Sequence, residues 1–294
     1  MDWDHLRVFL AVARRGQILA AAQALGLNHA TVARRLNALE ETLGEPLFER
    51  RPSGSTLTEA GERLLAVAER VETEILGIAE DTRARGASLS GTVRVGAPDG
   101  LGTYFLAAEL GRLQEEHPGL IVELVPLPRT FSLSKREADL AITLDPPAEG
   151  RLVVSKLTDY TLGVYAASAY LRQHGTPESE EALADHVVVT GVEDYAYASS
   201  LNYAGHLARF AGRQFRCAGV AGQMEAVRAG IGVGILHDFV ARDAEGLERI
   251  LPAVGFRRAY HLLSHPDTGS LARIALIRAF LARRFREERS RFAP

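Results

Sequence analysis

The side chains with the clearest potential for recognition chemistry lie between positions 28 and 35 of the 294-residue chain. His29 and Thr31 have side chains that can donate and accept hydrogen bonds, and Arg34 and Arg35 add two cations. In a helix these four side chains fall outside an apolar stripe formed by Val32, Leu36, Leu39 and Leu43. Imidazole, hydroxyl and guanidinium groups can reach base edges and phosphates in the DNA major groove. The pattern is compatible with a nucleic-acid-reading surface, to which Asn28 adds an amide, but a helix pair of this kind is common in any helical domain and does not by itself indicate DNA binding.

Three helices are predicted to position this surface. Asp4 can cap a helix over residues 4–15, and a second, alanine-rich helix is predicted over residues 18–25. The second helix stops at Gly26, where a tight turn favours a residue without a Cβ atom. Asn28 then caps a third helix that runs to about residue 43. Two helices joined by a short turn containing glycine form a helix-turn-helix.

A short hairpin is predicted over residues 47–57, with Pro52 and Gly54 at its tip. It has the size of a wing. Arg50 and Arg51 lie where a wing would touch the phosphate backbone of DNA. They are the predicted phosphate contacts.

A long helix is predicted from Thr58, its cap, to about Arg85. Its apolar residues alternate four- and three-residue steps, which is typical of a seam that pairs with another helix. These residues are Leu64, Ala68, Val71, Ile75 and Ile78. The alternative is an amphipathic helix that lies on its own domain. We predict pairing, because about seven helical turns have few loops around them to cover the seam.

Beyond a small, polar segment at residues 85–90, the pattern changes to alternating strands and helices. Strands are predicted at 92–97, 120–126, 139–144, 161–166, 186–190, 214–218, 232–236 and 259–264, and helices near 102–116, 168–174, 222–230 and 270–290. This alternation predicts an α/β domain with a largely parallel sheet.

About sixty N-terminal residues resemble the LysR-type transcriptional regulators in order and spacing. The matching elements are Phe9-Leu10, Ala21-Ala22, the run from Asn28 to Leu36, Leu39-Glu40, Leu43-Gly44, Leu47-Phe48, Arg50, Leu57-Thr58 and Gly61. The remainder resembles the same family more loosely, in Gly91 to Gly96, His117 to Gly119, Arg136 to Ile142 and Val227 to Ile235.

The resemblance implies an α/β protein with an N-terminal winged helix-turn-helix over residues 1–60. A dimerising linker helix and hinge would cover residues 58–90. A periplasmic-binding-protein-like effector domain would cover residues 91–294, with lobe one at about 92–163 and 265–294 and lobe two at about 164–264. The implied partners are operator or promoter DNA, a small-molecule effector, further copies of the chain in a homotetramer, and RNA polymerase. No cofactor is implied.

The effector is expected between the lobes, where strand ends and helix N-termini converge. The predicted contacts are Asp99, Gly100, Leu101, Thr103 and Thr143 on lobe one and Thr190 and Gln223 on lobe two. Asp99 is the fixed charge in this set, which favours a neutral or partly cationic ligand. Alternatively, Asp99 turns outward and caps a helix that begins near Gly102, which leaves anions permitted. The sequence leaves both readings open.

The chain departs from the family pattern at both sites. Asn28-His29-Ala30 stands where the family has serine-glutamine-proline, so the preferred operator would differ at the bases these residues read. Pro98 and Gly100 replace two hydroxyl residues that would bind an anionic ligand. The following helix N-terminus still offers free N–H groups to an anion.

Other classes of protein find less support. The histidines lack paired metal-ligand spacing, since His261 and His265 fall at a strand end, and Gly230 to Gly234 runs from helix to strand, the reverse of a dinucleotide fingerprint. We therefore expect neither an enzyme nor a metal site. A solute-binding protein would share the effector fold but would leave the first 85 residues without a purpose. A DNA-packing protein would be strongly basic, whereas the net charge is -3.

The remaining sequence features concern the cellular compartment, the single cysteine, a tyrosine-rich segment and the C-terminal arginines. No apolar run approaches the ~20 residues that span a bilayer, and the acidic N-terminus lacks the layout of a secretory signal, which predicts a cytoplasmic protein. The single cysteine, Cys217, is expected to be a buried small residue rather than a nucleophile or redox sensor. Aromatic and polar residues that could line the effector site or pack as a lid are Asp194, Tyr195, Tyr197, Asn202 and Tyr203. The C-terminal arginines are expected on a solvated helix face, namely Arg283, Arg284, Arg286, Arg289 and Arg291.

Overall fold

The computed structural model describes residues 2–51, 54–84, 89–126, 138–147, 152–192, 201, 203, 205–242, 244–266, 268–269 and 271–293, with the backbone alone for residues 50, 51, 73 and 76–84. The described residues up to position 89 form one compact unit, and most of the remaining residues form a second.

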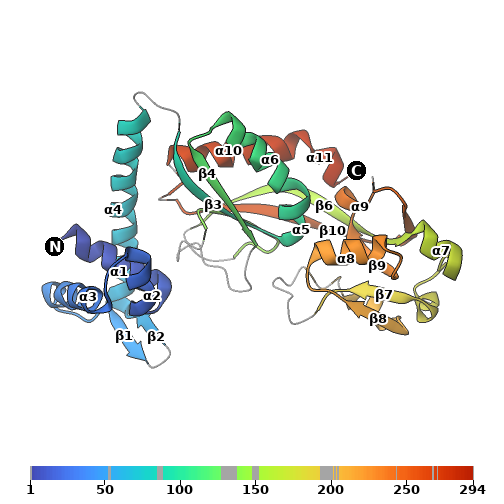
Figure 1. The fold of residues 1–294 in the computed structure, drawn as a ribbon, viewed down its shortest axis with the longest axis horizontal. Helices are drawn as coiled ribbons and strands as arrows, with labels where there is room; N and C mark the ends of the chain where they lie inside the picture. The colour runs from blue at the N-terminus through green and yellow to red at the C-terminus, as the bar shows by residue number, and fades with distance from the viewer. Residues whose placement is uncertain are drawn as a thin grey trace. The chain divides into compact units, whose positions relative to one another are not determined.

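The first unit contains helices and one hairpin, in the order expected from the sequence (Figure 1). Its elements are α1 (Trp3–Arg15), α2 (Ile18–Leu25), α3 (His29–Leu43), β1 (Phe48–Arg51), β2 (Gly54–Leu57) and α4 (Glu59–Ala84). One predicted cap is wrong: Asp2, and not Asp4, caps α1, and its Oδ1 accepts a bond from the N–H of Asp4 at 3.1 Å. Gly26 and Gly44 end α2 and α3 with left-handed backbone, at φ of 64° and 74°.

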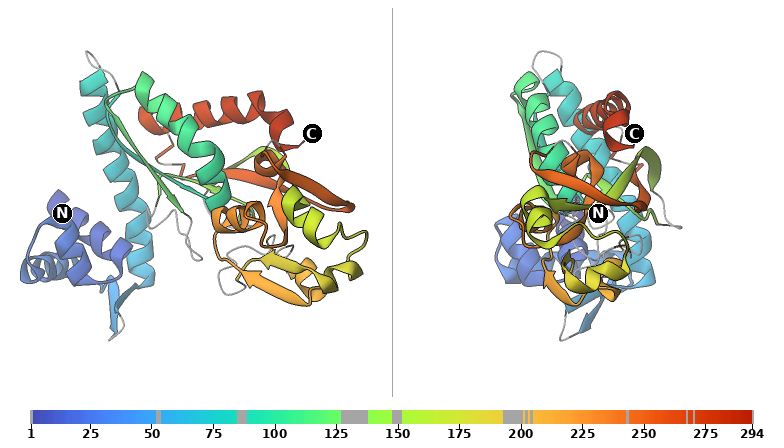
Figure 2. Two further views of the ribbon diagram at one scale, coloured as in Figure 1. Left: turned by 45° about the vertical axis from the view of Figure 1, so that its right-hand side comes forward. Right: turned by 90° about the vertical axis from the view of Figure 1, so that its right-hand side faces the viewer.

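The core of this unit is assembled from the inward faces of α1, α2 and α3. Its fully buried members include Val8, Phe9, Val12, Val32, Leu36 and Leu39. The ring of Phe9 lies 5.4 Å from that of Phe48, so the hairpin is tied to α1 by an aromatic contact. Figure 2 shows α1 to α3 and the hairpin gathered around the N-terminal part of α4.

The start of α4 is held against the hairpin by two residues. Thr58 Oγ1 donates to Pro46 O at 2.7 Å and accepts from the N–H of Gly61 at 3.0 Å, which caps the helix as predicted. A Cβ atom on Gly61 would lie 2.2 Å from Leu47 O, so only glycine permits this approach. The start of α4 can therefore pack this closely against Leu47 only because glycine follows the capping threonine by three positions.

The second unit contains a sheet with strand order β4-β3-β5-β10-β6-β9-β7-β8 among the described residues. The strands are β3 (Gly91–Ala97), β4 (Leu120–Pro126), β5 (Leu140–Thr143), β6 (Val153–Ala167), β7 (Val187–Thr190), β8 (Arg213–Arg216), β9 (Val233–His237) and β10 (Leu247–Ser264). The sheet is mixed and not largely parallel, because β10 pairs antiparallel with both β5 and β6, and β6 does so with β9.

The unit has two lobes that share the two long strands. β3, β4 and β5 lie at one end of the sheet, and β7, β8 and β9 lie at the other, while β6 and β10 run through both (Figure 1). The helical segments of the unit are α5 (Asp99–Leu101), the π-helical turn η1 (Gly102–Leu106), α6 (Ala107–Glu116), α7 (Ser168–His174), η2 (Glu181–Asp185), η5 (Leu207–Arg209), α8 (Val220–Arg228), α9 (Asp238–Ala241), α10 (Ala272–Glu287) and α11 (Arg289–Phe292).

The glycine-rich link between α8 and β9 has the packing role expected from its helix-to-strand order. Gly230 adopts a positive φ of 76°. A Cβ atom on Gly232 would lie 2.2 Å from Val187 O, and one on Gly234 would lie 2.8 Å from a methyl group of Val227. These glycines therefore let the helix and the strands approach closely.

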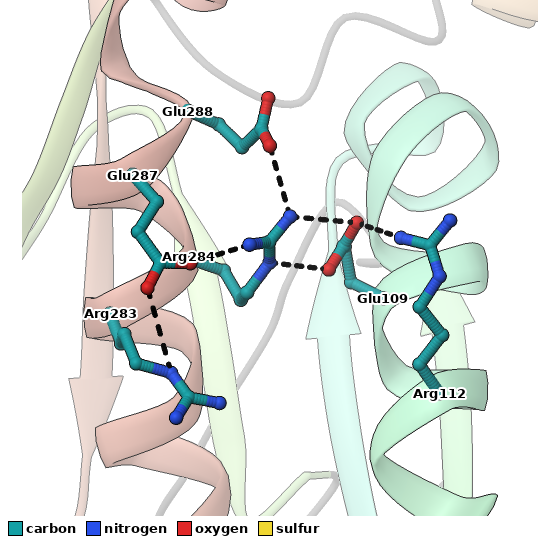
Figure 3. A network of polar contacts seen from close by, with 6 residues as sticks. All are labelled: Glu109, Arg112, Arg283, Arg284, Glu287 and Glu288. Atoms are coloured by element: carbon teal, nitrogen blue, oxygen red, sulfur yellow. Dashed lines mark hydrogen bonds and ion pairs between the residues drawn. The ribbon is translucent and has the colours of Figure 1, made fainter.

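The helix α10 is fixed to α6 by an ion-pair network (Figure 3). Arg284 Nε donates to Glu109 Oε2 at 2.6 Å, and Arg112 Nη1 donates to Glu109 Oε1 at 2.7 Å. The carboxylates of Glu287 and Glu288 hold the other nitrogens of Arg284. The hydrogen bond to Glu109, and after it the one to Glu287, raises the pKa of the Arg284 guanidinium above its ordinary value, although burial acts in the opposite direction. Arg283, Arg286, Arg289 and Arg291 are exposed as predicted, but Arg284 is not on a solvated face.

No helix in the described part of the chain has the length and apolar character needed to cross a membrane.

Candidate functional site

The helix α3 presents a polar face outward and an apolar face to the core. Val32, Leu36 and Leu39 are at most 1% exposed, so the helix is held rigidly by its inner face. Asn28 caps the helix, with its Oδ1 accepting from the N–H of Thr31 at 2.7 Å. Asn28, His29 and Arg34 are exposed and Thr31 is half-buried. These four predicted residues at the start of α3 are thus exposed or partly exposed, and their role in DNA binding stays a prediction.

Arg35 differs from Arg34 in having a partner inside the unit. Its Nη1 lies 3.2 Å from Asp4 Oδ2 on α1, and its side chain is 26% exposed. The same aspartate lies 3.9 Å from Arg7. Sequence reasoning missed this pair, because Asp4 was read only as a helix cap. Arg35 can reach a phosphate only by giving up or sharing the carboxylate of Asp4.

The hairpin is anchored so that its position relative to α3 is fixed. Glu40 on α3 accepts bonds through Oε1 from the N–H groups of Leu47 at 2.7 Å and Phe48 at 3.3 Å. On the other side, Ser55 donates its N–H to Gly16 O at 2.7 Å. Arg50 and Arg51 lie on β1, paired in register with Ser55 and Gly54, and their side chains lie outside the described residues. Backbone geometry thus supports a wing beside the reading helix.

The predicted seam on α4 divides between two faces. Ala68 is fully buried in the core of the first unit and Leu64 packs against that core, so these two residues serve their own domain. Val71 and Ile75 are 36% and 40% exposed, and Val67 is 45% exposed. The exposed stripe is therefore Val67, Val71 and Ile75. The side chain of Ile78 lies outside the described residues.

An ion-pair cluster connects α4 to α1. Arg14 donates to both carboxylate oxygens of Glu72, with Nη2 at 2.6 Å and Nη1 at 3.3 Å. The carboxylate of Glu69, which is 5% exposed, lies 3.9 Å from the same guanidinium. This bidentate contact fixes the direction in which α4 leaves the reading unit.

In the second unit, the first predicted effector residues lie where the two lobes touch. The helical run begins at Asp99 and not near Gly102, so Asp99 does not cap it in the expected way. Instead Asp99 Oδ2 accepts a bond of 2.8 Å from the N–H of Val220, the first residue of α8. Gly100 is buried, and a Cβ atom there would lie 2.9 Å from a methyl group of Val220.

The other predicted effector residues occupy different environments. Gln223 lies one turn further along α8 and donates from Nε2 to Cys217 O at 2.8 Å. Thr143 ends β5 and donates to Asp145 O at 3.2 Å, and Thr190 ends β7 and is 6% exposed. Leu101 is fully buried, whereas Thr103 is exposed. Of these residues, Leu101 shares α5 with Asp99 and Gln223 shares α8 with Val220, whereas Thr143 and Thr190 lie on separate strands.

Several remaining expectations concern the same lobe. Tyr203 is buried, and burial raises its pKa to about 12, although its neighbour Arg258 opposes that shift. Asp194, Tyr195, Tyr197 and Asn202 lie outside the described residues. Cys217 is half-buried rather than buried.

Among the described residues, no three histidine, cysteine, aspartate or glutamate side chains are grouped to hold a metal ion.

These features define a winged helix-turn-helix protein with a two-lobed α/β domain. Two family models match the chain: "Bacterial regulatory helix-turn-helix protein, lysR family" over residues 3–62, and "LysR substrate binding domain" over residues 86–286. The second match alone covers more than half of the sequence. The chain therefore belongs to the LysR family.

Comparison with individual proteins agrees with this assignment. The chain is 32% identical over 171 residues to the transcriptional regulator PtxR of Pseudomonas aeruginosa, covering 58% of this chain and 55% of PtxR. It is 35% identical over 145 residues to the regulator DgdR of Burkholderia cepacia, covering 48% of this chain and 49% of DgdR. The chain thus spans about half the length of these curated relatives.

Solved structures extend the likeness in fold over the whole chain. A full-length OxyR variant from Pseudomonas aeruginosa has a TM-score of 0.69 at 22% identity, covering 100% of this chain and 97% of OxyR. ArgP from Mycobacterium tuberculosis has a TM-score of 0.71 at 20% identity, covering 97% of both chains.

Proposed function

We propose that this protein is a sequence-specific, DNA-binding transcriptional regulator whose activity is modulated by a small-molecule effector. The observation that carries the proposal is α3, whose inner face is buried to 1% exposure or less while His29 and Arg34 stand outward. A rigid helix with exposed cationic and hydrogen-bonding side chains is the form in which helix-turn-helix proteins read the major groove.

The proposal assigns different roles to the arginines. Arg34, exposed on α3, approaches base edges, since arginine makes the commonest specific contact with guanine. Arg50 and Arg51 on the wing contact phosphates, which supply affinity without sequence information. Asn28, His29, Thr31 and Arg35 complete the reading surface.

The test is binding to the DNA upstream of the protein's own gene, compared with a scrambled sequence of equal length. We expect a specificity ratio of about 1000 or more at physiological salt. Arg50→Ala should weaken both complexes alike and lower the salt slope by about one. Equal affinity of the unmodified protein for the two DNAs would contradict the proposal.

The effector is proposed to contact the two lobes near the α5–α8 junction. Asp99, Gly100, Leu101, Thr103, Thr143, Thr190 and Gln223 remain the candidate set, with Leu101 contributing shape rather than contact because it is fully buried. A thermal-shift screen of neutral, cationic and anionic metabolites would identify the ligand class. Stabilisation that rises with the logarithm of the ligand concentration above its Kd is expected for the true effector.

The assembly is proposed to be a dimer formed through α4 and then a homotetramer. The exposed stripe of Val67, Val71 and Ile75 supports pairing of two linker helices. The proposed location is the cytoplasm, where operator DNA and RNA polymerase are available as partners. The proposal includes no catalytic activity and no cofactor.

A further inference from the structure

The N-terminus of α8 receives its acceptor from the other lobe. The first N–H groups of a helix need acceptors from outside, and the N-cap residue of α8, Gly219, supplies no side chain. The Val220 N–H is bonded at 2.8 Å by the carboxylate of Asp99, which is 121 positions away in the sequence.

The close approach depends on small residues on both sides. A Cβ atom on Gly219 would lie 3.3 Å from Asp99 Oδ2, which is tighter than ordinary van der Waals contact. A Cβ atom on Gly100 would come within 2.9 Å of Val220 Cγ1. The starts of α5 and α8 are therefore fitted to each other at the backbone.

Apolar packing continues the same junction. Tyr104, in the π-helical turn that follows α5, packs against a lobe-two cluster that includes Met224 and Val227. Burial raises the pKa of the Tyr104 hydroxyl, and the charges of Glu225 and Asp99 raise it further. Arg228 opposes that shift, and it is also paired with Glu225 at 2.7 Å.

Charge decides what else can bind here. The N-terminus of a helix carries roughly half a positive charge, whereas the carboxylate of Asp99 carries a full negative one. The net charge of the helix N-terminus and the carboxylate together is therefore negative, and an anion placed beside Asp99 would be repelled. A neutral or cationic group meets no such repulsion.

We propose that Asp99 is a specificity-determining residue, which occupies the N-terminus of α8, excludes anions from it and joins the two lobes through its bond to Val220. The proposal rests on the proposed effector function of this domain. It goes beyond that function in assigning the charge class of the effector to one side chain.

The test compares three variants of the full chain. Asp99→Asn keeps an oxygen acceptor but removes the charge, Asp99→Ala removes both, and Glu116→Gln changes the same charge at an exposed position on α6. Hydrogen exchange is followed in peptides covering residues 218–224. We expect exchange about tenfold faster in Asp99→Ala, a smaller increase in Asp99→Asn, and no change in Glu116→Gln.

Sodium sulfate, titrated at constant ionic strength, supplies the second readout. Sulfate should slow exchange at residues 218–224 in Asp99→Asn and Asp99→Ala with a saturable dependence, and should leave the unmodified protein unchanged. Unaltered exchange in both variants, or equal protection of the unmodified protein by sulfate, would overturn the proposal. Asp99→Asn alone suffices if the alanine variant does not fold. Because no DNA is present, failure here leaves the proposed DNA reading intact, and failure of DNA reading leaves this result intact.

Discussion

Arg35 on the reading helix and Asp4 on α1 form an ion pair, with 3.2 Å between Nη1 and Oδ2. Both side chains are partly exposed, at 26% and 43%, so the pair itself contributes only about 0–1 kcal/mol to stability. Its larger effect concerns DNA, because Asp4 holds negative charge beside a residue assigned to the reading surface.

Asp4→Asn is therefore expected to increase affinity for random DNA by about threefold to tenfold and to steepen the salt slope by about one. The physical reason is that Arg35 becomes free to neutralise a phosphate. Fluorescence anisotropy over a range of salt concentrations measures both quantities. An unchanged salt slope would show that Arg35 does not reach the DNA backbone.

The pair Arg284–Glu109 should stabilise the effector unit, because Glu109 is 7% exposed at its side chain and Arg284 is 22% exposed. Glu109→Gln and Arg284→Met should each lower the free energy of unfolding by about 1.5–3 kcal/mol, since each removes a charge-assisted hydrogen bond that the remaining partners, Arg112 for Glu109 and Glu287 with Glu288 for Arg284, replace only in part. The double variant should lose about 1–3 kcal/mol less than the sum. Chemical denaturation gives these values, with the exposed Arg283→Ala as control. Additive losses would contradict direct coupling.

His237 makes stability depend on pH. Burial lowers its pKa from 6.5 to about 4, although Asp238 acts in the opposite direction. Between these values the unfolded chain binds a proton on this residue and the native chain does not. The contribution of His237 to the free energy of unfolding is therefore most favourable above pH 6.5. It falls by up to about 3 kcal/mol as the pH falls towards 4.

His237→Gln should flatten the pH dependence of the free energy of unfolding in this window, although His186, whose pKa burial also lowers, retains part of it. Denaturation at half-unit pH steps measures the slope, and His117→Gln is the control. A slope unchanged from that of the unmodified protein would mean that His237 is protonated in the native state.

Val71→Glu tests the exposed stripe on α4. Val71 is 36% exposed in the single chain, so glutamate is tolerated by the monomer but would be buried in a helix pair. Analytical ultracentrifugation should show a reduced mass for Val71→Glu and an unchanged mass for Arg70→Glu on the same helix. A Val71→Glu protein with the full mass would show that the stripe lies outside the interface.

The sequence predicted the reading unit closely, because its signals are local. Caps at Asn28 and Thr58, the stop at Gly26 and the buried stripe of α3 all depend on residues within a few positions of one another. The predicted α4 seam was wrong at Ala68, which is buried in its own domain, and pairing through Val71 and Ile75 stays a prediction. A stripe with four- and three-residue steps does not reveal that Ala68 faces its own domain while Val71 faces outward.

The effector unit was less predictable because its contacts are distant in sequence. The strands predicted at 161–166 and 259–264 were too short, since mutual pairing extends β6 and β10 through both lobes. The bond from Val220 to Asp99 joins residues 121 positions apart. Such a contact follows from the topology, not from residue spacing.

The measurement that tests the central claim most directly is base discrimination by Arg34. Affinities of the unmodified protein, Arg34→Ala and the exposed control Arg70→Ala are determined for the operator and for its single-base-pair variants. We predict that Arg34→Ala loses about 1–3 kcal/mol on the operator, loses less on random DNA, and no longer discriminates at one base pair of each half-site. Arg70→Ala should retain the full pattern. If Arg34→Ala weakens every DNA equally and keeps that pattern, α3 does not read the bases through Arg34 and the account is contradicted.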